Sequence, residues 1–303
     1  MSRIAYVNGL YMPTRSAVVQ IDDRGYQFAD GVYEVCVVRD GRIIDEERHL
    51  KRLERSLGEL SIRWPVTPSA LAIVMREVIQ RNRVRDGTVY IQVTRGVGPR
   101  NHVFTPETVC PSLVVTARSV DWAVADESAA KGIAVISTPD NRWERVDIKT
   151  ISLLPNVLAK QKAKEAGAGE AWFVDSKGFV TEGASSNAWI VTTDGVLVTR
   201  DVDRGILRGV TRDVVLKMLE RENLVFEERR FTIAEAQSAR EAFITSAGNL
   251  VMPVIKIDGR IVGSGMPGEL SLKLRQLFFT EAEASPRIWR PKPIAHNSKL
   301  FDK

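Results

Sequence analysis

The chain has 303 residues, 44% hydrophobic and 27% charged, so it can bury a large core and is expected to fold as a soluble globular protein. Of its net charge of +5, residues 285–303 carry +4, and the nearly neutral remainder lacks the basic stripe of a nucleic-acid-binding protein. The start of the chain has no apolar signal segment, and no window approaches the roughly 18 apolar residues of a membrane span.

The N-terminal part alternates hairpins and helices. Asn8-Gly9 and Asp40-Gly41 supply the positive φ angles of tight turns and predict hairpins over residues 3–12 and 34–44. Apolar residues at helical spacing predict helices over 47–60 and 68–82, and strands are expected at 88–96 and 112–120. Residues 121–132 are polar and rich in small residues, so we expect a linker there and a domain boundary near residue 120.

The second part continues with strands and helices. Strands are expected at 133–138 and 241–246, helices at 152–167, 210–223 and 269–284, and hairpins at 171–183, at 187–199 and around Asp258-Gly259. Strands clustered in hairpins with interspersed helices favour α+β domains over a doubly wound parallel sheet. The expected organisation is a small domain over 1–120, a larger, strand-rich domain over 121–284, and a basic, flexible tail over 285–303.

The cysteines and histidines exclude several kinds of site. Cys36 and Cys110 are far apart and follow no metal-ligand spacing, which favours a reducing compartment, the cytoplasm, without disulfides. With three histidines, no zinc site built on imidazole is expected, and neither a dinucleotide-binding glycine motif nor a P-loop is present. We therefore predict no metal.

Lys149 lies in an unusual place, inside the apolar, strand-like run 146–154. Burying a lysine is costly unless the amine is neutralised, paired or converted to an imine. The alternative is a lysine that ends a strand and extends to water.

Two further segments combine groups that suit an anionic, aromatic ligand. In "TEGASSNAW", Glu182 precedes a turn of small residues, where it could neutralise a ring nitrogen while Ser185 and Ser186 contact a substrate. In "GILRGVTRDVV", Val210 and Thr211 occupy the first turn of a helix, whose free N–H groups suit a phosphate. A solvated hairpin turn and ordinary helix capping are the alternatives.

The loop "VTRGVGPRNHVF" holds two arginines and a histidine, which suits either an exposed turn or a clamp for an anion. Together with "FADGVYE", "HLKRL", "DIKT", "TEGASSN", "GILRGVTR" and "TSAGNLVMPV", it gives seven motifs in an order that resembles the fold-type IV pyridoxal 5′-phosphate (PLP) enzymes. The resemblance covers residues 3–280 and is closest to the D-amino-acid transaminases. It implies PLP, a two-domain α+β fold and a homodimer whose active site is completed by the partner subunit.

The resemblance also assigns the cofactor-binding residues. Lys149 corresponds to the catalytic lysine, which holds PLP as a Schiff base and moves the substrate α-proton. Glu182 corresponds to the partner of the pyridine nitrogen, and Arg52 to the phosphate arginine. Leu207 corresponds to the residue packed against the ring, and Arg142 to a residue near the phenolic oxygen.

The phosphate cup corresponds to Val210 and Thr211, with Ser246 and Ala247 on a late turn. Where relatives commonly have threonines on that turn, this chain has Ser246, Ala247 and Gly248, so at least one hydroxyl contact to the phosphate is missing. We expect weaker cofactor binding rather than a different reaction.

The substrate-binding residues that the resemblance implies are Tyr33, Arg100 and His102, with Ser185 and Ser186. Arg100 and His102 reach across the dimer and bind the substrate α-carboxylate together with Tyr33, since a guanidinium donates two parallel hydrogen bonds to a carboxylate. The implied reaction is a ping-pong transamination between a D-amino acid and a 2-oxo acid through pyridoxamine phosphate, for example from D-alanine to 2-oxoglutarate.

Four alternatives remain at this point. A branched-chain L-amino-acid transaminase, an (R)-amine transaminase and an aminodeoxychorismate lyase share the fold, and a carrier or regulator could have kept the fold without activity. The Arg100 and His102 pair argues against the first two, pyruvate release without an amino acceptor would mark the third, and failure to bind PLP would mark the fourth.

Overall fold

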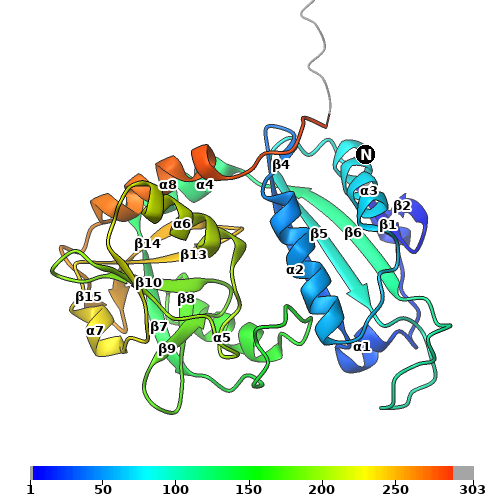
Figure 1. Cartoon of the computed structure of the whole chain (residues 1–303), viewed down its shortest axis with the longest axis horizontal. Helices are drawn as coiled ribbons and strands as arrows, with labels where there is room; N and C mark the ends of the chain where they lie inside the picture. The colour runs from blue at the N-terminus through cyan, green and yellow to red at the C-terminus, as the bar shows by residue number, and fades with distance from the viewer. Residues whose placement is uncertain (1–2, 289–303) are drawn as a thin grey trace, which may run out of the picture.

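The structure is a computed structural model that describes residues 3–288, and it consists of two lobes, each built on its own sheet (Figure 1). The first sheet is formed by residues 4–43 and 87–119, and the second by residues 133–261. This arrangement confirms the predicted α+β class with two domains. The predicted tail falls mostly on residues 289–303, which lie outside the described residues.

The first sheet has six antiparallel strands in the order β2-β1-β6-β5-β3-β4. The strands are β1 Ile4–Val7, β2 Leu10–Pro13, β3 Gly31–Arg39, β4 Arg42–Ile43, β5 Gly87–Thr94 and β6 Ser112–Ser119. Both predicted hairpins are confirmed, and Asn8 and Asp40 at their turns have φ of 46° and 48°.

Two helices cover a face of this sheet, α2 Glu46–Glu59 and α3 Pro68–Arg81 (Figure 1). Both were predicted from their apolar spacing. The Thr67 side chain caps α3 by accepting a hydrogen bond from the amide of Ala70 at 3.2 Å, and Pro68 occupies the first turn, where its missing N–H is not needed. Leu53 and Leu71 are fully buried against the sheet.

Short elements that were not predicted precede β3: a 3-10 turn η1 Thr14–Ser16 and a helix α1 Arg24–Phe28. Helix α1 begins because the Asp23 carboxylate accepts a hydrogen bond from the amide of Gly25 at 2.8 Å. It ends at Ala29, which has a left-handed φ of 54°.

The segment 121–132, where a linker was expected, forms the helix α4 Trp122–Lys131. The Asp121 side chain caps it, accepting from the amide of Ala123 at 3.0 Å. Small residues favoured a linker, but most of them are alanines, which have the highest helix propensity.

The second sheet is mixed, with the order β12-β11-β10-β13-β14-β7-β8-β9 and β15 paired with β14. Its strands are β7 Ile133–Pro139, β8 Glu170–Val174, β9 Val180–Gly183, β10 Asn187–Val191, β11 Leu197–Thr199, β12 Phe226–Glu228, β13 Glu241–Ser246, β14 Leu250–Ile257 and β15 Arg260–Ile261. The further helices are α5 Leu154–Glu165, α6 Val210–Arg221, α7 Ile233–Gln237 and α8 Glu269–Glu281. Of these elements, β12 and α7 were not predicted.

The segment around Lys149 is not a strand, which corrects the interpretation of residues 146–154. It forms a turn with a single bridge, Thr150 to Val32, and then enters α5. The turn contacts the first lobe: the Arg55 guanidinium donates to the carboxylate of Asp147 at 2.5 Å. The segment comes between β7 and α5 of the second lobe, and these contacts tie it to the first lobe. It therefore connects the two lobes.

After α8 the chain returns to the first lobe (Figure 1). The carbonyl of Glu283 accepts from the amide of Asp45 at 2.7 Å, and the amide of Ser285 donates to the carbonyl of Ile43 at 2.9 Å. The first residues of the predicted tail are thus paired with the β4 edge. Among residues 3–288, no helix is long and apolar enough to cross a membrane.

Candidate active site

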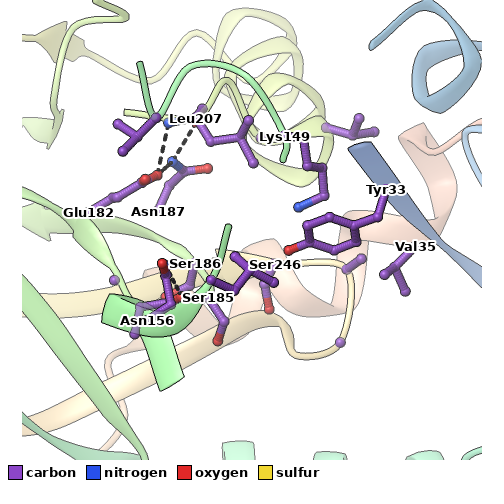
Figure 2. Close-up of a pocket in the computed structure, with 18 of the residues that line it drawn as sticks. Tyr33, Val35, Lys149, Asn156, Glu182, Ser185, Ser186, Asn187, Leu207 and Ser246 are labelled. Atoms are coloured by element: carbon purple, nitrogen blue, oxygen red, sulfur yellow. Dashed lines mark hydrogen bonds between the residues drawn. The ribbon is translucent and has the colours of Figure 1, made fainter. Parts of the chain in front are cut away.

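A cavity of about 460 Å³ lies where the two lobes meet, a size typical of small-molecule sites. One wall comes from the first lobe, with Tyr33 and Val35 on β3 and Arg52 on α2. The others come from residues 142–156, the β9–β10 turn, the start of α6 and the turn between β13 and β14. Figure 2 shows Lys149 beside Tyr33, with Glu182 on the opposite side.

Lys149 presents its amine to this cavity. Its Nζ lies 4.2 Å from the centroid of the Tyr33 ring, a distance at which the ring face stabilises an ammonium group. Its carbonyl accepts from the amide of Tyr33 at 3.0 Å, and its own amide donates to Ser56 Oγ at 3.3 Å. The backbone is therefore fixed while the amine faces the cavity.

Glu182 is a buried carboxylate on the opposite wall. It accepts from the amide of Leu207 at 3.0 Å and from Asn187 Nδ2 at 3.1 Å (Figure 2). Arg142 Nη1 donates to its other oxygen at 2.5 Å. Burial raises the pKa of Glu182 above its ordinary value, and Arg142 opposes that shift.

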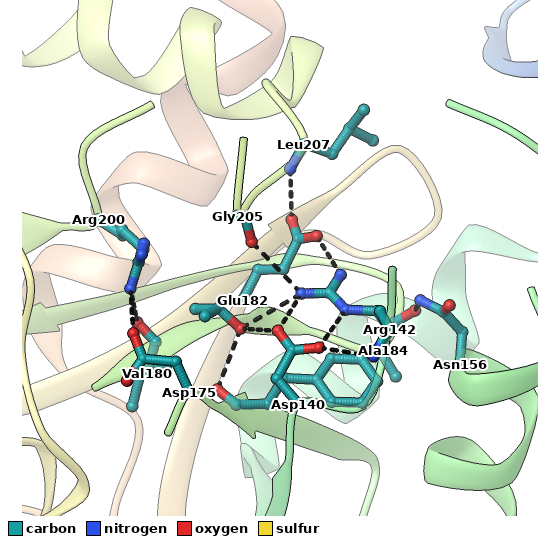
Figure 3. Close-up of polar contacts among 12 residues, drawn as sticks. Asp140, Arg142, Asn156, Asp175, Val180, Glu182, Ala184, Arg200, Gly205 and Leu207 are labelled. Atoms are coloured by element: carbon teal, nitrogen blue, oxygen red, sulfur yellow. Dashed lines mark hydrogen bonds and ion pairs between the residues drawn. The ribbon is translucent and has the colours of Figure 1, made fainter. Parts of the chain in front are cut away.

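Arg142 is itself held in place by Asp140, which accepts from its Nε at 2.9 Å and its Nη2 at 2.7 Å (Figure 3). The Thr181 hydroxyl donates to the same carboxylate at 2.8 Å. Burial would lower the pKa of Arg142, but Glu182 and Asp140 raise it above its ordinary value, so the guanidinium stays charged beside Glu182.

The start of α6 forms a third wall. No side chain in the described part of the chain caps this helix, and Val210 and Thr211 line the cavity in its first turn. The preceding Gly209 is closely packed, because a Cβ there would lie 2.1 Å from Asn187 Oδ1 and the Asn187 side chain would have to move. Uncapped N–H groups and the positive end of the helix dipole are features that suit an anion.

The turn after β13 lies on the same cavity. Ser246 Oγ accepts from the amide of Asn249 at 3.2 Å, and Thr245 Oγ1 accepts from Trp189 Nε1 at 3.0 Å. Ala247 contributes no hydroxyl. Ser246, Ala247, Val210 and Thr211, which the sequence assigned to one phosphate cup, therefore do line one cavity.

Arg52 has a partner that sequence reasoning missed. The fully buried Glu34 accepts from Arg52 Nε at 2.7 Å and Nη2 at 2.9 Å, and it also lies 2.7 Å from His49 Nδ1. Burial would raise the pKa of Glu34, but Arg52 and His49 hold it far below its ordinary value. The available signal was a carboxylate in the apolar strand "GVYEVCVV", where a charge needs a buried partner.

Ser185 and Ser186 also line the cavity, and both depend on a second residue that was missed. Their hydroxyls donate to the buried Glu170, at 2.8 Å from Ser185 and 3.0 Å from Ser186. A carboxylate at the start of β8 thus fixes the serine turn.

Arg100 and His102 do not line the cavity of their own chain. They lie on the loop between β5 and β6, beside Phe28, and both are exposed. Arg95, the other arginine of the loop, pairs with Asp30 and is buried. Among residues 3–288, no group of histidine, cysteine, aspartate and glutamate side chains could hold a metal ion.

Known proteins resemble this chain over most of its length. A D-alanine aminotransferase of Staphylococcus haemolyticus is 39% identical over 274 residues, which cover 90% of this chain and 95% of the relative. A D-alanine aminotransferase of Bacillus licheniformis is 41% identical over 268 residues, 87% of this chain and 92% of the relative.

Solved structures agree with this fold. The T.th. branched-chain amino acid aminotransferase, complexed with N-(5′-phosphopyridoxyl)-L-glutamate, superposes with a TM-score of 0.83 at 27% identity, covering 92% of this chain and 93% of that one. The Escherichia coli branched-chain enzyme, at 22% identity and a TM-score of 0.84, covers 92% and 94% and supports the fold alone. The family model described as amino-transferase class IV matches residues 31–257, and the chain belongs to this family.

Proposed function

We propose that the protein is a PLP-dependent aminotransferase that transfers the amino group between a D-amino acid, D-alanine first among them, and a 2-oxo acid. The observation that carries this proposal is the arrangement of three groups around one cavity. The amine of Lys149 and the buried carboxylate of Glu182 lie on opposite sides of this cavity, and the uncapped start of α6 lines it as well.

The residues of the cavity fit PLP. The start of α6, with Thr211 and Ser246, suits the phosphate, and the charge of Arg52 is close to the same wall, since its Nη1 donates to the carbonyl of Arg208 at 3.0 Å. Glu182 suits a protonated ring nitrogen, and Leu207 suits the ring face. When bound, PLP supplies the electron sink for cleavage of a bond at the amino acid's α-carbon.

Lys149 acts as the acid and base of the reaction. Its amine would hold PLP when the cofactor is bound and, once free, would take the α-proton of the substrate and carry it across the cavity. The aromatic face of Tyr33 beside Nζ limits where that proton is carried. Arg142, charged and held by Asp140, keeps Glu182 oriented toward the ring nitrogen.

The substrate carboxylate is bound by Arg100 and His102 of the partner subunit, together with Tyr33. This assignment explains why the two residues are exposed in their own chain. Large apolar side chains around that loop are exposed as well, Ile21 by 77%, Tyr26 by 76% and Val103 by 72%, as is expected of a surface that a second copy covers. The active unit in this proposal is a homodimer.

Two coarser features belong to the same proposal. We place the boundary between the domains near residue 120, since β6 ends at Ser119 and the second sheet begins with β7 at Ile133. The protein acts in the cytoplasm, and its two cysteines, both free, suit that compartment.

A single half-reaction tests the proposal. PLP-loaded protein is mixed without amino acceptor with D-alanine, L-alanine or L-leucine, while the visible absorbance of the lysine-bound cofactor and the 2-oxo acid are followed. We expect D-alanine alone to abolish the absorbance and to yield stoichiometric pyruvate.

A response to L-leucine alone would replace the proposal by branched-chain transamination, the activity named for the superposed T.th. structure. Pyruvate formed from D-alanine in large excess over the enzyme, without acceptor, would show that the amino group does not stay on the cofactor, which transamination requires.

A further inference from the structure

The loop between β5 and β6, residues 95–111, is held at its base by a buried charge cluster. Asp30 accepts from Arg24 Nε at 2.8 Å, from Arg95 Nε at 2.8 Å and from Arg95 Nη2 at 3.0 Å. Both arginine side chains are at least nine-tenths buried, with 4% of Arg24 and 8% of Arg95 exposed. Two charged residues from outside the loop therefore hold its first residue.

Arg24 also reaches the middle of the loop. Its Nη1 donates to the carbonyl of Asn101 at 2.5 Å and to the carbonyl of Val103 at 3.2 Å. These two carbonyls lie on either side of His102. One buried guanidinium, that of Arg24, thus fixes the backbone on both sides of His102.

Phe28 adds an aromatic support. Its ring centroid lies 4.8 Å from Arg24 Cζ, 5.1 Å from Arg100 Cζ and 5.4 Å from the centroid of the His102 ring. The same residue therefore contacts the guanidinium that fixes the loop and both side chains at its tip. Neither Arg24 nor Phe28 is among the site residues predicted from the sequence.

We infer that Arg24, assisted by Asp30 and Phe28, is a positioning residue for substrate recognition: it fixes the direction in which Arg100 and His102 project from their own subunit. This inference rests on the proposed function, in which those two side chains bind the substrate carboxylate in the partner's cavity. A carboxylate clamp needs such fixing because paired hydrogen bonds to a carboxylate tolerate little misplacement.

Arginine suits this position for a geometric reason. One planar group donates from Nε to the Asp30 carboxylate and from Nη1 to two carbonyls, which a lysine amine on a flexible stem cannot reproduce. The loop also holds the start of α1, because the amide of Arg24 donates to the carbonyl of Gly96 at 2.9 Å. Helix and loop are thereby joined through both backbone and side chain.

The test uses PLP-loaded, full-length variants Arg24→Met and Phe28→Leu. The matched control is Arg63→Met, because Arg63 Nη2 donates to a carbonyl of the same loop, Val109, at 3.1 Å, but does so far from its tip. Four quantities are measured for each protein: KM for D-alanine, kcat for D-alanine, the dissociation constant of PLP, and hydrogen exchange of the amides at 97–104.

We expect Arg24→Met to raise the KM for D-alanine about tenfold or more and to change kcat far less, since the lost contacts serve binding. Exchange at 97–104 should quicken while PLP affinity stays unchanged. Phe28→Leu should raise KM to a lesser degree, and Arg63→Met should leave KM unchanged.

An unchanged KM in Arg24→Met and Phe28→Leu, or an equal rise in Arg63→Met, would overturn the inference. So would unchanged exchange at 97–104 in Arg24→Met, a readout that needs no turnover. Failure of the proposed function looks different, because the wild-type protein itself would not convert D-alanine.

Discussion

Arg52 and Glu34 are joined by two hydrogen bonds, of 2.7 and 2.9 Å, inside the first lobe. The arginine expected to serve a phosphate is therefore held by a carboxylate from the neighbouring strand, and His49 Nδ1 lies 2.7 Å from Oε2 of that carboxylate. The guanidinium of Arg52 is thus held at the cavity by a buried ion pair, and it does not have the freedom of a side chain on the surface.

Glu34→Gln should change how stability depends on pH. The pKa of Glu34 is lowered on folding, so its contribution is fully present above its ordinary value of 4.5 and is lost as the pH falls below that value. The variant should lose about 3 kcal/mol at neutral pH, since Arg52 loses its charged partner, and less in acid. Urea unfolding of the cofactor-free protein across this range measures both.

The control for this prediction is Glu47→Gln, which removes an exposed carboxylate paired with Lys51 on the surface of α2. Its unfolding free energy should stay close to the wild type. If Glu34→Gln followed the wild-type pH dependence in parallel, the carboxylate would not be ionised within the fold.

Lys149→Ala should lower the rate of pyruvate formation from D-alanine by about 10³-fold or more, because the acid and base of the reaction is removed. The start of α6 is unchanged, so the variant should still bind pyridoxamine phosphate. Initial rates and a fluorescence titration separate the two effects, with the exposed Lys51→Ala as control. Turnover at the wild-type rate would end the assignment of Lys149.

Glu182→Gln should keep the hydrogen bond from the amide of Leu207 but lose the negative charge beside the ring nitrogen. We expect kcat to fall by about 10²-fold, a typical loss for a removed electrostatic contact, with a smaller change in KM. Stopped-flow measurement of the D-alanine half-reaction tests this. An unchanged kcat would mean that this carboxylate does not govern the ring nitrogen.

Gly209→Ala should weaken phosphate binding, because the new methyl group would displace Asn187 from its contacts with Glu182 and the carbonyl of Leu207. Gly58→Ala is the matched control. Nothing lies within 4 Å of a Cβ at Gly58, in the last turn of α2, so alanine should stabilise the fold by up to about 1 kcal/mol. PLP affinity and thermal unfolding are measured for both variants. If Gly209→Ala bound PLP as tightly as Gly58→Ala, the predicted clash with Asn187 would have no effect on binding.

Ala247→Ser should tighten PLP binding about fivefold or more, because it adds a hydroxyl donor to the turn opposite α6. The substitution is small and lies on a partly exposed position of the cavity. Titration of the cofactor-free protein with PLP measures the change. Binding that is equal or weaker would place the phosphate away from this turn.

Turn residues and apolar spacing predicted most of the helices and strands. The cases in which these signals failed have physical reasons. Asn8, Asp40 and Asp258 have the positive φ that their hairpins required. The run around Lys149 looked like a strand because of its apolar residues, but tertiary contacts with the first lobe determine its turn. Strand propensity and apolar pattern take account only of the residues of the segment itself, whereas the conformation of this segment depends on Arg55 and Val32 in the first lobe.

The side chains that line the cavity were mostly predicted from the sequence. The buried carboxylates that hold those side chains in place were not. Lys149, Glu182, Thr211 and Ser246 converge on it although they are far apart in the chain. Glu34 lies in the motif "FADGVYE" but received no role from it, and it holds an expected site residue from inside the fold. The sequence locates a charge but not the buried counter-charge, since that pairing arises only when strands and helices pack.

The return of the chain to β4 has a consequence for synthesis on the ribosome. Strand β4 is the edge of the first sheet, and Ser285 is the residue that pairs with it through Ile43. Every other strand has been translated before this cover emerges, so the nascent first lobe presents an open edge to other chains for most of its synthesis. A chain interrupted after α8 keeps that edge open permanently and is therefore more exposed to strand-to-strand aggregation than the 303-residue chain.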